Sequence, residues 1–192
     1  SLAERIIPAT DISEQISTAG TEASGTGNMK FALNGALTIG TLDGANIEIR
    51  EEVGADHFFL FGKTNEELEE MKRSGSYNPW DYYHKFPEIK RIMDALKGGF
   101  FDLDEPALYQ PIYDALLTHG DRYFHMADFH SYVDCQQFAD QVYRDRDRWL
   151  RMCTMNIAHS GKFSSDRTIQ EYSDEIWSLK PCRIELPSGD NS

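Results

Sequence analysis

Basic residues and cysteines are both scarce in this chain of 192 residues. It has 19 Lys and Arg against 32 Asp and Glu, which gives a formal net charge of −13. Nucleic acids and anionic membranes bind basic surfaces, so we expect neither as a partner. The three cysteines, Cys135, Cys153 and Cys182, form no C-x-x-C pair and no even set. That pattern is typical of reduced thiols in a cytoplasmic protein.

Long apolar runs are absent as well. The longest largely apolar stretches are residues 31–39 and 58–61, far below the roughly 20 residues that a membrane span requires. No cationic segment followed by an apolar one opens the chain, so we expect no secretory signal. The chain begins at Ser1 without methionine, and we therefore expect a fragment of a longer protein.

Glycines and short apolar runs indicate an α/β fold for residues 1–62. Eight of the 14 glycines occur there. Residues 36–40 and 58–61 are short apolar runs without alternation, which is typical of buried strands in a parallel sheet. Residues 26–33 are predicted as a short helix, and residues 46–53 as a short crossover element between the two strands.

The chain from residue 63 to residue 187 is expected to be mostly helical, followed by a disordered tail at 188–192. Thr64 and Glu67 have the spacing of a capping box, and Pro87 suits the first turn of another helix. Four further helices are predicted from apolar faces. Those faces are Leu108, Ile112, Ala115 and Leu116; Phe138, Val142 and Tyr143; Trp149, Met152, Cys153 and Ile157; and Ile169, Tyr172, Ile176 and Trp177.

Several polar and aromatic clusters are better explained by structure than by a binding site. His119, His125 and His130 lack the spacing of metal ligands on a helix, and we expect no metal site. Residues 144–151 alternate arginine with aspartate, which predicts a solvated helix junction. The aromatic residues between 77 and 86 are expected to pack in a core.

Charge is nearly missing between Gln15 and Leu42, where Glu22 and Lys30 are the only ionisable side chains. A lysine buried in such a neutral segment has a lowered pKa, and its amine then reacts with an aldehyde at neutral pH. This pattern favours covalent attachment of an aldehyde cofactor to Lys30. The alternative is a lysine that extends from a short helix into solvent.

Two glycines and two hydroxyl residues precede Lys30 in the sequence Ser24-Gly25-Thr26-Gly27. Glycines let backbone N–H groups approach an anion closely, and the start of a helix adds free donors, so a phosphate site is reasonable here. The segment does not match the P-loop motif, because Thr26-Gly27 stands where that motif requires Lys followed by Ser or Thr. It does not match the dinucleotide fingerprint either, because Lys30 stands where the third glycine is required. A plain glycine-rich turn is the alternative.

Three longer motifs resemble one enzyme family. Residues 22–34 (EASGTGNMKFALN) are similar, without a gap, to the pyridoxal-phosphate attachment segment of the α-glucan phosphorylases, which act on glycogen, starch or maltodextrin. Residues 35–46 (GALTIGTLDGAN) and 160–169 (SGKFSSDRTI) resemble the same family in the same order. The resemblance extends over nearly the whole chain.

The resemblance implies a fold and a reaction. The chain would be the C-terminal half of a Rossmann-like domain of a glycosyltransferase-B type enzyme, with a largely helical C-terminal region. Residues 1–192 would thus be part of the cofactor-binding domain, and the missing N-terminal portion of the same protein would be a partner. The full-length protein would be a homodimer. It would use inorganic phosphate to release glucose 1-phosphate, with retention, from the ends of an α-1,4-glucan.

The resemblance also implies roles for seven residues. Lys30 would carry pyridoxal phosphate, with Thr26 and Gly27 contacting its phosphate. The glucosyl site would be lined by Glu22, Ala23, Ser24 and Gly25, with Glu22 accepting hydrogen bonds from sugar hydroxyls. The family's other phosphate-binding basic residues belong to the missing portion, so we expect the chain alone to be inactive. A second hypothesis is a non-enzymatic α/β module whose glycine-rich segment binds a phosphate or packs a turn.

Overall fold

A small parallel sheet lies at the centre of the first part of the chain. Strands β1 (Ile12–Gln15), β2 (Leu37–Gly40) and β3 (Phe59–Leu60) pair in the order β1-β2-β3, and both pairs are parallel. The central strand β2 is buried along its whole length. This confirms the interpretation of an apolar run without alternation as a buried parallel strand.

Strands β2 and β3 lie within the two apolar runs predicted as strands, whereas β1 was not predicted. The residues Ile-Ser-Glu-Gln of β1 are mostly polar, and only Ser13 among them is buried. Its place at the edge of the sheet tolerates such residues, because one side of the strand has no strand neighbour in residues 1–180.

The structure, a computed structural model, describes residues 1–180. They fall into two compact units, Ser1–Ser160 and Gly161–Ser192, the second described as far as residue 180. The expected tail at 188–192 and Cys182 lie outside the described residues, and the expected boundaries at 62 and 187 stay predictions. No helix of residues 1–180 has both the length and the apolar character needed to cross a membrane.

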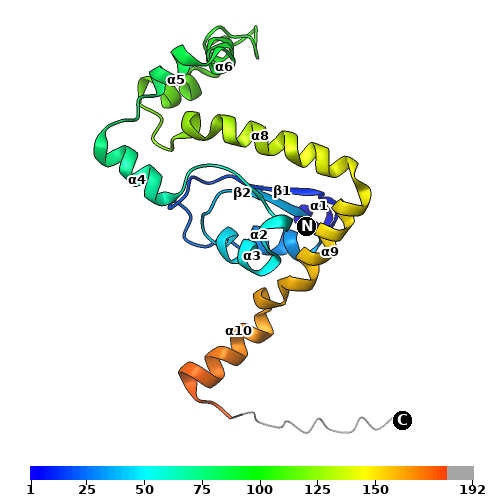
Figure 1. The fold of residues 1–192 in the computed structure, drawn as a ribbon. Coiled ribbons are helices and arrows are strands. Elements are labelled where there is room, and N and C mark those ends of the chain that lie inside the picture. Colours follow the sequence, from blue (N-terminus) through cyan, green and yellow to red (C-terminus); the bar gives the residue numbers. More distant parts are fainter. Residues whose placement is uncertain (181–192) are drawn as a thin grey trace. The chain divides into compact units, whose positions relative to one another are not determined.

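Helices make up most of the remaining structure (Figure 1). In the first unit they are α1 (Leu2–Ile6), α2 (Gly27–Leu33), α3 (Asn46–Val53), α4 (Asn65–Ser74), α5 (Pro79–Lys85), α6 (Pro87–Lys97), α7 (Gln110–Tyr113), α8 (His125–Arg144) and α9 (Arg146–His159). The short helix and the crossover element predicted from the sequence correspond to α2 and α3.

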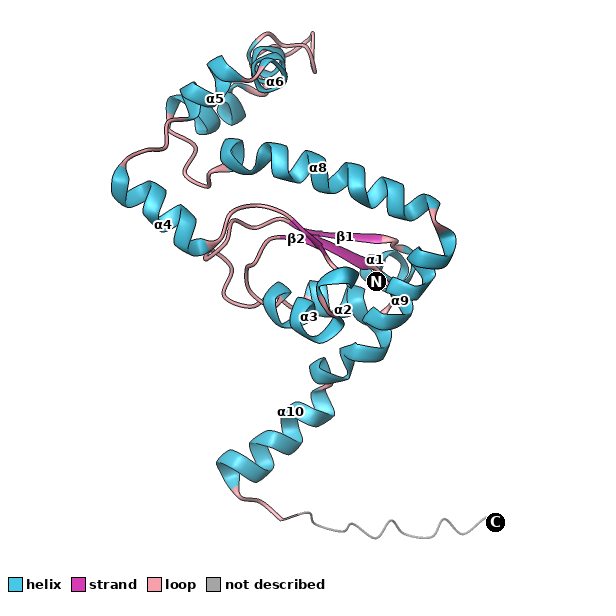
Figure 2. Ribbon diagram, in the orientation of Figure 1, coloured by secondary structure: helices cyan, strands magenta, loops and turns pink. Residues whose placement is uncertain are grey.

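The two faces of the sheet are covered by different helices (Figure 2). Helix α8 lies along one face, where Leu37, Ile39 and Phe59 form a core with Trp149 of α9. Helices α2 and α3 lie on the other side and bury Ala32 and Ile49. Because both faces are covered, the open positions at the sheet are its ends and edges, where α/β proteins bind ligands.

Local signals in the sequence predicted the starts of two helices correctly, those of α4 and α6. The hydroxyl of Thr64 accepts a hydrogen bond from the Glu67 N–H, and the Glu67 carboxylate accepts one from the Thr64 N–H at 2.8 Å. Gly75 ends α4 with a φ of 63°, in the left-handed region that glycine adopts at low cost. Pro87 begins α6, as expected from its fixed φ.

Three of the predicted apolar faces are wrong in part. The face expected from Leu108, Ile112, Ala115 and Leu116 is displaced, because a π-helical turn (Asp114–Thr118) follows α7 and the buried residues are Tyr113 and Leu117. Ile157 is 50% exposed at the end of the α9 face. Phe138 and Tyr143 are also largely exposed, although their rings pack edge-on against Phe59 and Trp149.

The second unit contains α10 (Ser165–Glu171) and a π-helical segment (Tyr172–Trp177). Ser164 is the N-cap residue of α10 and makes no capping hydrogen bond with its side chain. The predicted apolar residues Ile169, Tyr172, Ile176 and Trp177 are all exposed within the described residues.

Candidate functional site

The glycine-rich segment before Lys30 lies at the carboxyl edge of the sheet. β1 ends at Gln15 and β2 at Gly40, and because the strands are parallel, the loops that follow them are neighbours. A cavity of about 180 Å³ opens between these loops. Its lining is Glu14, Gln15, Ile16, Ser17, Glu22, Ser24, Gly25, Asn28, Asp43 and Asn46. Open α/β sheets bind their ligands at this edge.

A buried carboxylate fastens the main chain of the glycine-rich segment. Asp43, only 3% exposed, accepts hydrogen bonds from the Gly20 N–H at Oδ1 and the Glu22 N–H at Oδ2, each at 2.9 Å. Next to it, the Ala45 N–H donates to the Ser24 carbonyl at 2.8 Å. The main chain of residues 20–24 is thus held in place, while the side chains of Glu22 and Ser24 stay exposed.

A second buried group joins the sheet to α2. Asn46 Nδ2 donates to the carbonyls of Gln15 at 3.3 Å and Thr41 at 3.2 Å. Its Oδ1 accepts a hydrogen bond from Asn28 Nδ2 at 3.0 Å. The N–H of Met29 donates in turn to Asn28 Oδ1 at 2.9 Å. These contacts set the first turn of α2, and hence Lys30, relative to the ends of β1 and β2.

Two glycines are required for this close approach of main chain to main chain. A Cβ on Gly44 would lie 2.4 Å from the Ser24 carbonyl oxygen, and the φ of Gly44 is +49°. A Cβ on Gly40 would lie 2.9 Å from Asn46 Nδ2 and 3.0 Å from the Gln15 carbonyl oxygen. Any larger residue at either position would push apart the loops that line the cavity.

Helix α2 places the cofactor candidates on one side of the segment. Thr26 is its N-cap residue and makes no capping hydrogen bond with its side chain. Lys30 lies four residues further on, one turn along the same face. The structure exposes Lys30, which agrees with the alternative of a lysine that extends from a short helix into solvent. A Cβ on Gly27 would meet no atom within 4 Å, which leaves room for a ligand beside the helix start.

The site contains buried polar residues to which the sequence analysis assigned no role. They are Asn28, Thr41, Asp43 and Asn46. Three of them, Thr41, Asp43 and Asn46, could have been identified by their position after β2, because polar residues that follow a buried parallel strand gather at the carboxyl edge of the sheet. The hydroxyl of Thr41, for example, donates to the Ser17 carbonyl at 2.6 Å, across the loops after β2 and β1.

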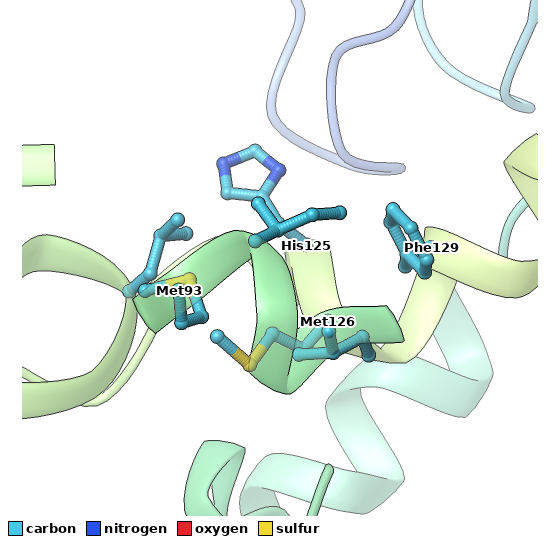
Figure 3. A pocket seen from close by; sticks show the side chains of 7 residues that line it. Met93, His125, Met126 and Phe129 are labelled. Carbon is cyan, nitrogen blue, oxygen red and sulfur yellow. The ribbon is translucent and has the colours of Figure 1, made fainter. Parts of the chain in front are cut away.

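A separate apolar cavity of about 90 Å³ lies between α6 and α8 (Figure 3). Met93, Met126 and Phe129 line it, with His125 at its side. Its lining has almost no polar atoms that could orient a ligand, so we regard it as a packing gap in the second core cluster. Among residues 1–180 no three His, Cys, Asp or Glu side chains are grouped to hold a metal ion.

Comparison with known proteins gives matches along nearly all of the chain. The family model described as "Carbohydrate phosphorylase" matches residues 1–179. The chain is 57% identical over 183 residues to glycogen phosphorylase of Synechocystis sp., covering 95% of this chain and 21% of that protein. It is 53% identical to the muscle form of glycogen phosphorylase from Rattus norvegicus, over 99% of this chain and 22% of that protein. The chain therefore spans about a fifth of the length of these relatives.

Proposed function

This chain belongs to the carbohydrate phosphorylase family, and on that premise we propose that it forms part of the catalytic domain of a glucan phosphorylase. The substrates would be an α-1,4-glucan and inorganic phosphate, and the product glucose 1-phosphate. The observation that carries the proposal is the arrangement at the carboxyl edge of the sheet, where Glu22, Ser24 and Gly25 line a cavity and Lys30 follows four residues after Thr26.

The chain would hold pyridoxal phosphate at the start of α2. Thr26 and Gly27 would donate to the cofactor phosphate from the hydroxyl and the backbone N–H, and Lys30 would bind the cofactor covalently. The fit is supported by the uncommitted hydroxyl of Thr26 and by the open space beside Gly27. Residues four apart on a helix have Cβ atoms about 5–6 Å apart, so one small molecule can contact both Thr26 and Lys30.

The glucosyl site would be formed by Glu22, Ala23, Ser24 and Gly25. The Glu22 carboxylate would accept hydrogen bonds from sugar hydroxyls, because its main chain is fastened to Asp43 while its side chain is exposed beside the cavity. Hydrogen bonds to a charged acceptor contribute about 1.5–3 kcal/mol each. Such contacts position the terminal sugar for attack by phosphate.

In the proposed enzyme the phosphate of the cofactor, once bound, would supply a proton-transfer partner for the substrate phosphate. Two neighbouring phosphates need a cationic clamp. Lys30 is the only basic residue between Arg5 and Arg50, so further cations would come from the missing N-terminal portion. We infer that this portion completes a Rossmann-like domain and a cleft of the glycosyltransferase-B type. The whole protein would be a cytoplasmic homodimer.

The test of this proposal is the covalent attachment of the cofactor. The full-length protein is reduced with borohydride, digested and analysed by mass spectrometry for a pyridoxyl group. We expect the label on Lys30 and the loss of an imine absorption band on reduction. A label on Lys63 or another lysine would contradict the assignment, and the absence of any label would favour the non-enzymatic module.

A further inference from the structure

We propose that Asp43 is a positioning residue of the glucosyl site, which acts by holding the main chain of residues 20–24 in the conformation that presents Glu22 to the sugar. This inference rests on the proposed function and adds a residue to it. Asp43 acts on the substrate only through the segment that it fastens.

The two carboxylate oxygens of Asp43 accept hydrogen bonds from two residues that are two positions apart. Oδ1 accepts from the Gly20 N–H and Oδ2 from the Glu22 N–H, so one side chain fixes the Ala19–Gly20 and the Thr21–Glu22 peptide groups. Charged acceptors make shorter and stronger hydrogen bonds to N–H groups than neutral ones do. At 3% exposure, Asp43 has little access to water that could compete for these contacts.

The loop that carries Asp43 adds contacts on both sides of Glu22. Thr41 donates to the Ser17 carbonyl before the segment, and Ala45 donates to the Ser24 carbonyl after it. Gly44 lets the two main chains come this close, since its missing Cβ would collide with the Ser24 oxygen. Residues 41–45 therefore hold the segment at residues 20, 22 and 24 and hold the chain before it at residue 17.

The side chains on this fastened segment remain free. Glu22, Ala23 and Ser24 are all exposed, and Glu22 and Ser24 line the cavity. A fixed main chain with accessible polar side chains is what a preorganised binding site requires. A loop held only for stability has no need to present a carboxylate in this way.

The first arm of the test measures amide hydrogen exchange in the full-length holoenzyme. Asp43→Asn has the same shape but replaces one acceptor by an NH₂ donor that faces a backbone N–H, and Asp43→Ala removes both acceptors. We expect exchange in peptides covering residues 19–24 to rise from wild type to Asp43→Asn and further in Asp43→Ala. The control is Asp134→Asn, which removes the same charge from an exposed position on α8.

The second arm measures cofactor content and kcat/KM for phosphorolysis. We expect Asp43→Asn to keep a full cofactor content and to lower kcat/KM by about tenfold, the effect of losing one good hydrogen bond to a charged group. Because Asp43 acts through Glu22, the same substitution should cost much less in a Glu22→Gln background. A general loss of stability would reduce activity equally in both backgrounds.

The outcomes separate the two proposals. Unchanged exchange in Asp43→Asn, an equal loss of activity in both backgrounds, or loss of the cofactor would overturn the positioning role. Absence of cofactor and activity from the wild-type protein would instead overturn the proposed function. In that case the exchange arm still decides whether Asp43 fastens the segment.

Discussion

Asn28 and Asn46 are joined side chain to side chain by a hydrogen bond of 3.0 Å, although 18 positions separate them in the sequence. Both residues are at least 96% buried, and each makes further contacts with the main chain. Through this pair, the first turn of α2 is attached to the ends of β1 and β2. The pair therefore links the element that bears Lys30 to the cavity.

Asn46→Asp should destabilise the protein. The substitution replaces a donor to the Gln15 and Thr41 carbonyls by an oxygen, which leaves the part-buried Gln15 carbonyl and the buried Thr41 carbonyl without this donor. A buried group left unpaired costs about 1–3 kcal/mol. We expect a lower urea midpoint for the full-length protein. Gln137→Glu, an exposed amide-to-acid change on α8, is the control and should leave the midpoint unchanged.

Lys30→Ala should abolish activity through loss of the cofactor with little effect on folding. Lys30 is exposed on α2, and alanine is a good helix former, so the helix itself is retained. The measurements are bound pyridoxal phosphate by absorbance and secondary structure by circular dichroism. Lys85→Ala, at an exposed position of α5, should keep both cofactor and activity. Full cofactor content in Lys30→Ala would rule out the assignment.

Glu22→Gln should weaken substrate recognition without affecting the cofactor. The backbone N–H of residue 22 still donates to Asp43, so the segment keeps its conformation while the charged acceptor is lost. A loss of about 1.5–3 kcal/mol corresponds to a fall in kcat/KM of tenfold or more. Steady-state kinetics with maltodextrin and phosphate test this, with the exposed Glu48→Gln as control. Normal kinetics or a missing cofactor would each contradict the role.

Asp128→Asn should change the pH dependence of stability. Burial raises the pKa of the Asp128 carboxyl above its ordinary value of 3.8, against the opposing effect of the Lys63 N–H. A raised folded-state pKa means that the stability gained by protonation is present below the ordinary pKa and is lost as the pH rises through the folded value. The asparagine variant does not titrate and keeps an acceptor for Lys63.

The measurement is the urea midpoint of both proteins from about pH 3.5 upward. The midpoint of Asp128→Asn should rise relative to wild type as the pH increases across that window. The exposed Asp134→Asn serves as the control for loss of one charge on α8. A difference between variant and wild type that is constant with pH would show that the carboxyl has an ordinary pKa in the folded protein.

The chain of 192 residues should be catalytically silent when produced alone. It spans about one fifth of the length of its relatives. Between Arg5 and Arg50, the part of the chain that lines the cavity, Lys30 is the single basic residue. The test is an assay for glucose 1-phosphate from maltodextrin and phosphate, with pyridoxal phosphate added. Turnover comparable to that of a full-length phosphorylase would mean that residues 1–192 contain a complete cationic clamp.

Helix ends and the central strand follow from short stretches of the sequence alone. The capping box of Thr64 and Glu67 and the position of Pro87 depend on residues at most three apart, so the chain determines them wherever it folds. The buried strand β2 is predicted from its continuous apolar run. The strand β1 is not, because its four residues are mostly polar and form a strand only by pairing with β2.

The sequence by itself determined which segment is unusual, and the tertiary structure decided what holds that segment. Glu22, Lys30 and the glycines between them stand out in a stretch almost without charge. Asp43 lies 21 and 23 residues from the two N–H groups that it binds, and Asn46 lies 18 residues from Asn28 and 31 from Gln15. The local sequence around an aspartate is the same whether its carboxylate faces water or accepts hydrogen bonds from two backbone N–H groups. Only the parallel pairing of β1 with β2, which brings the two following loops together, selects between these environments.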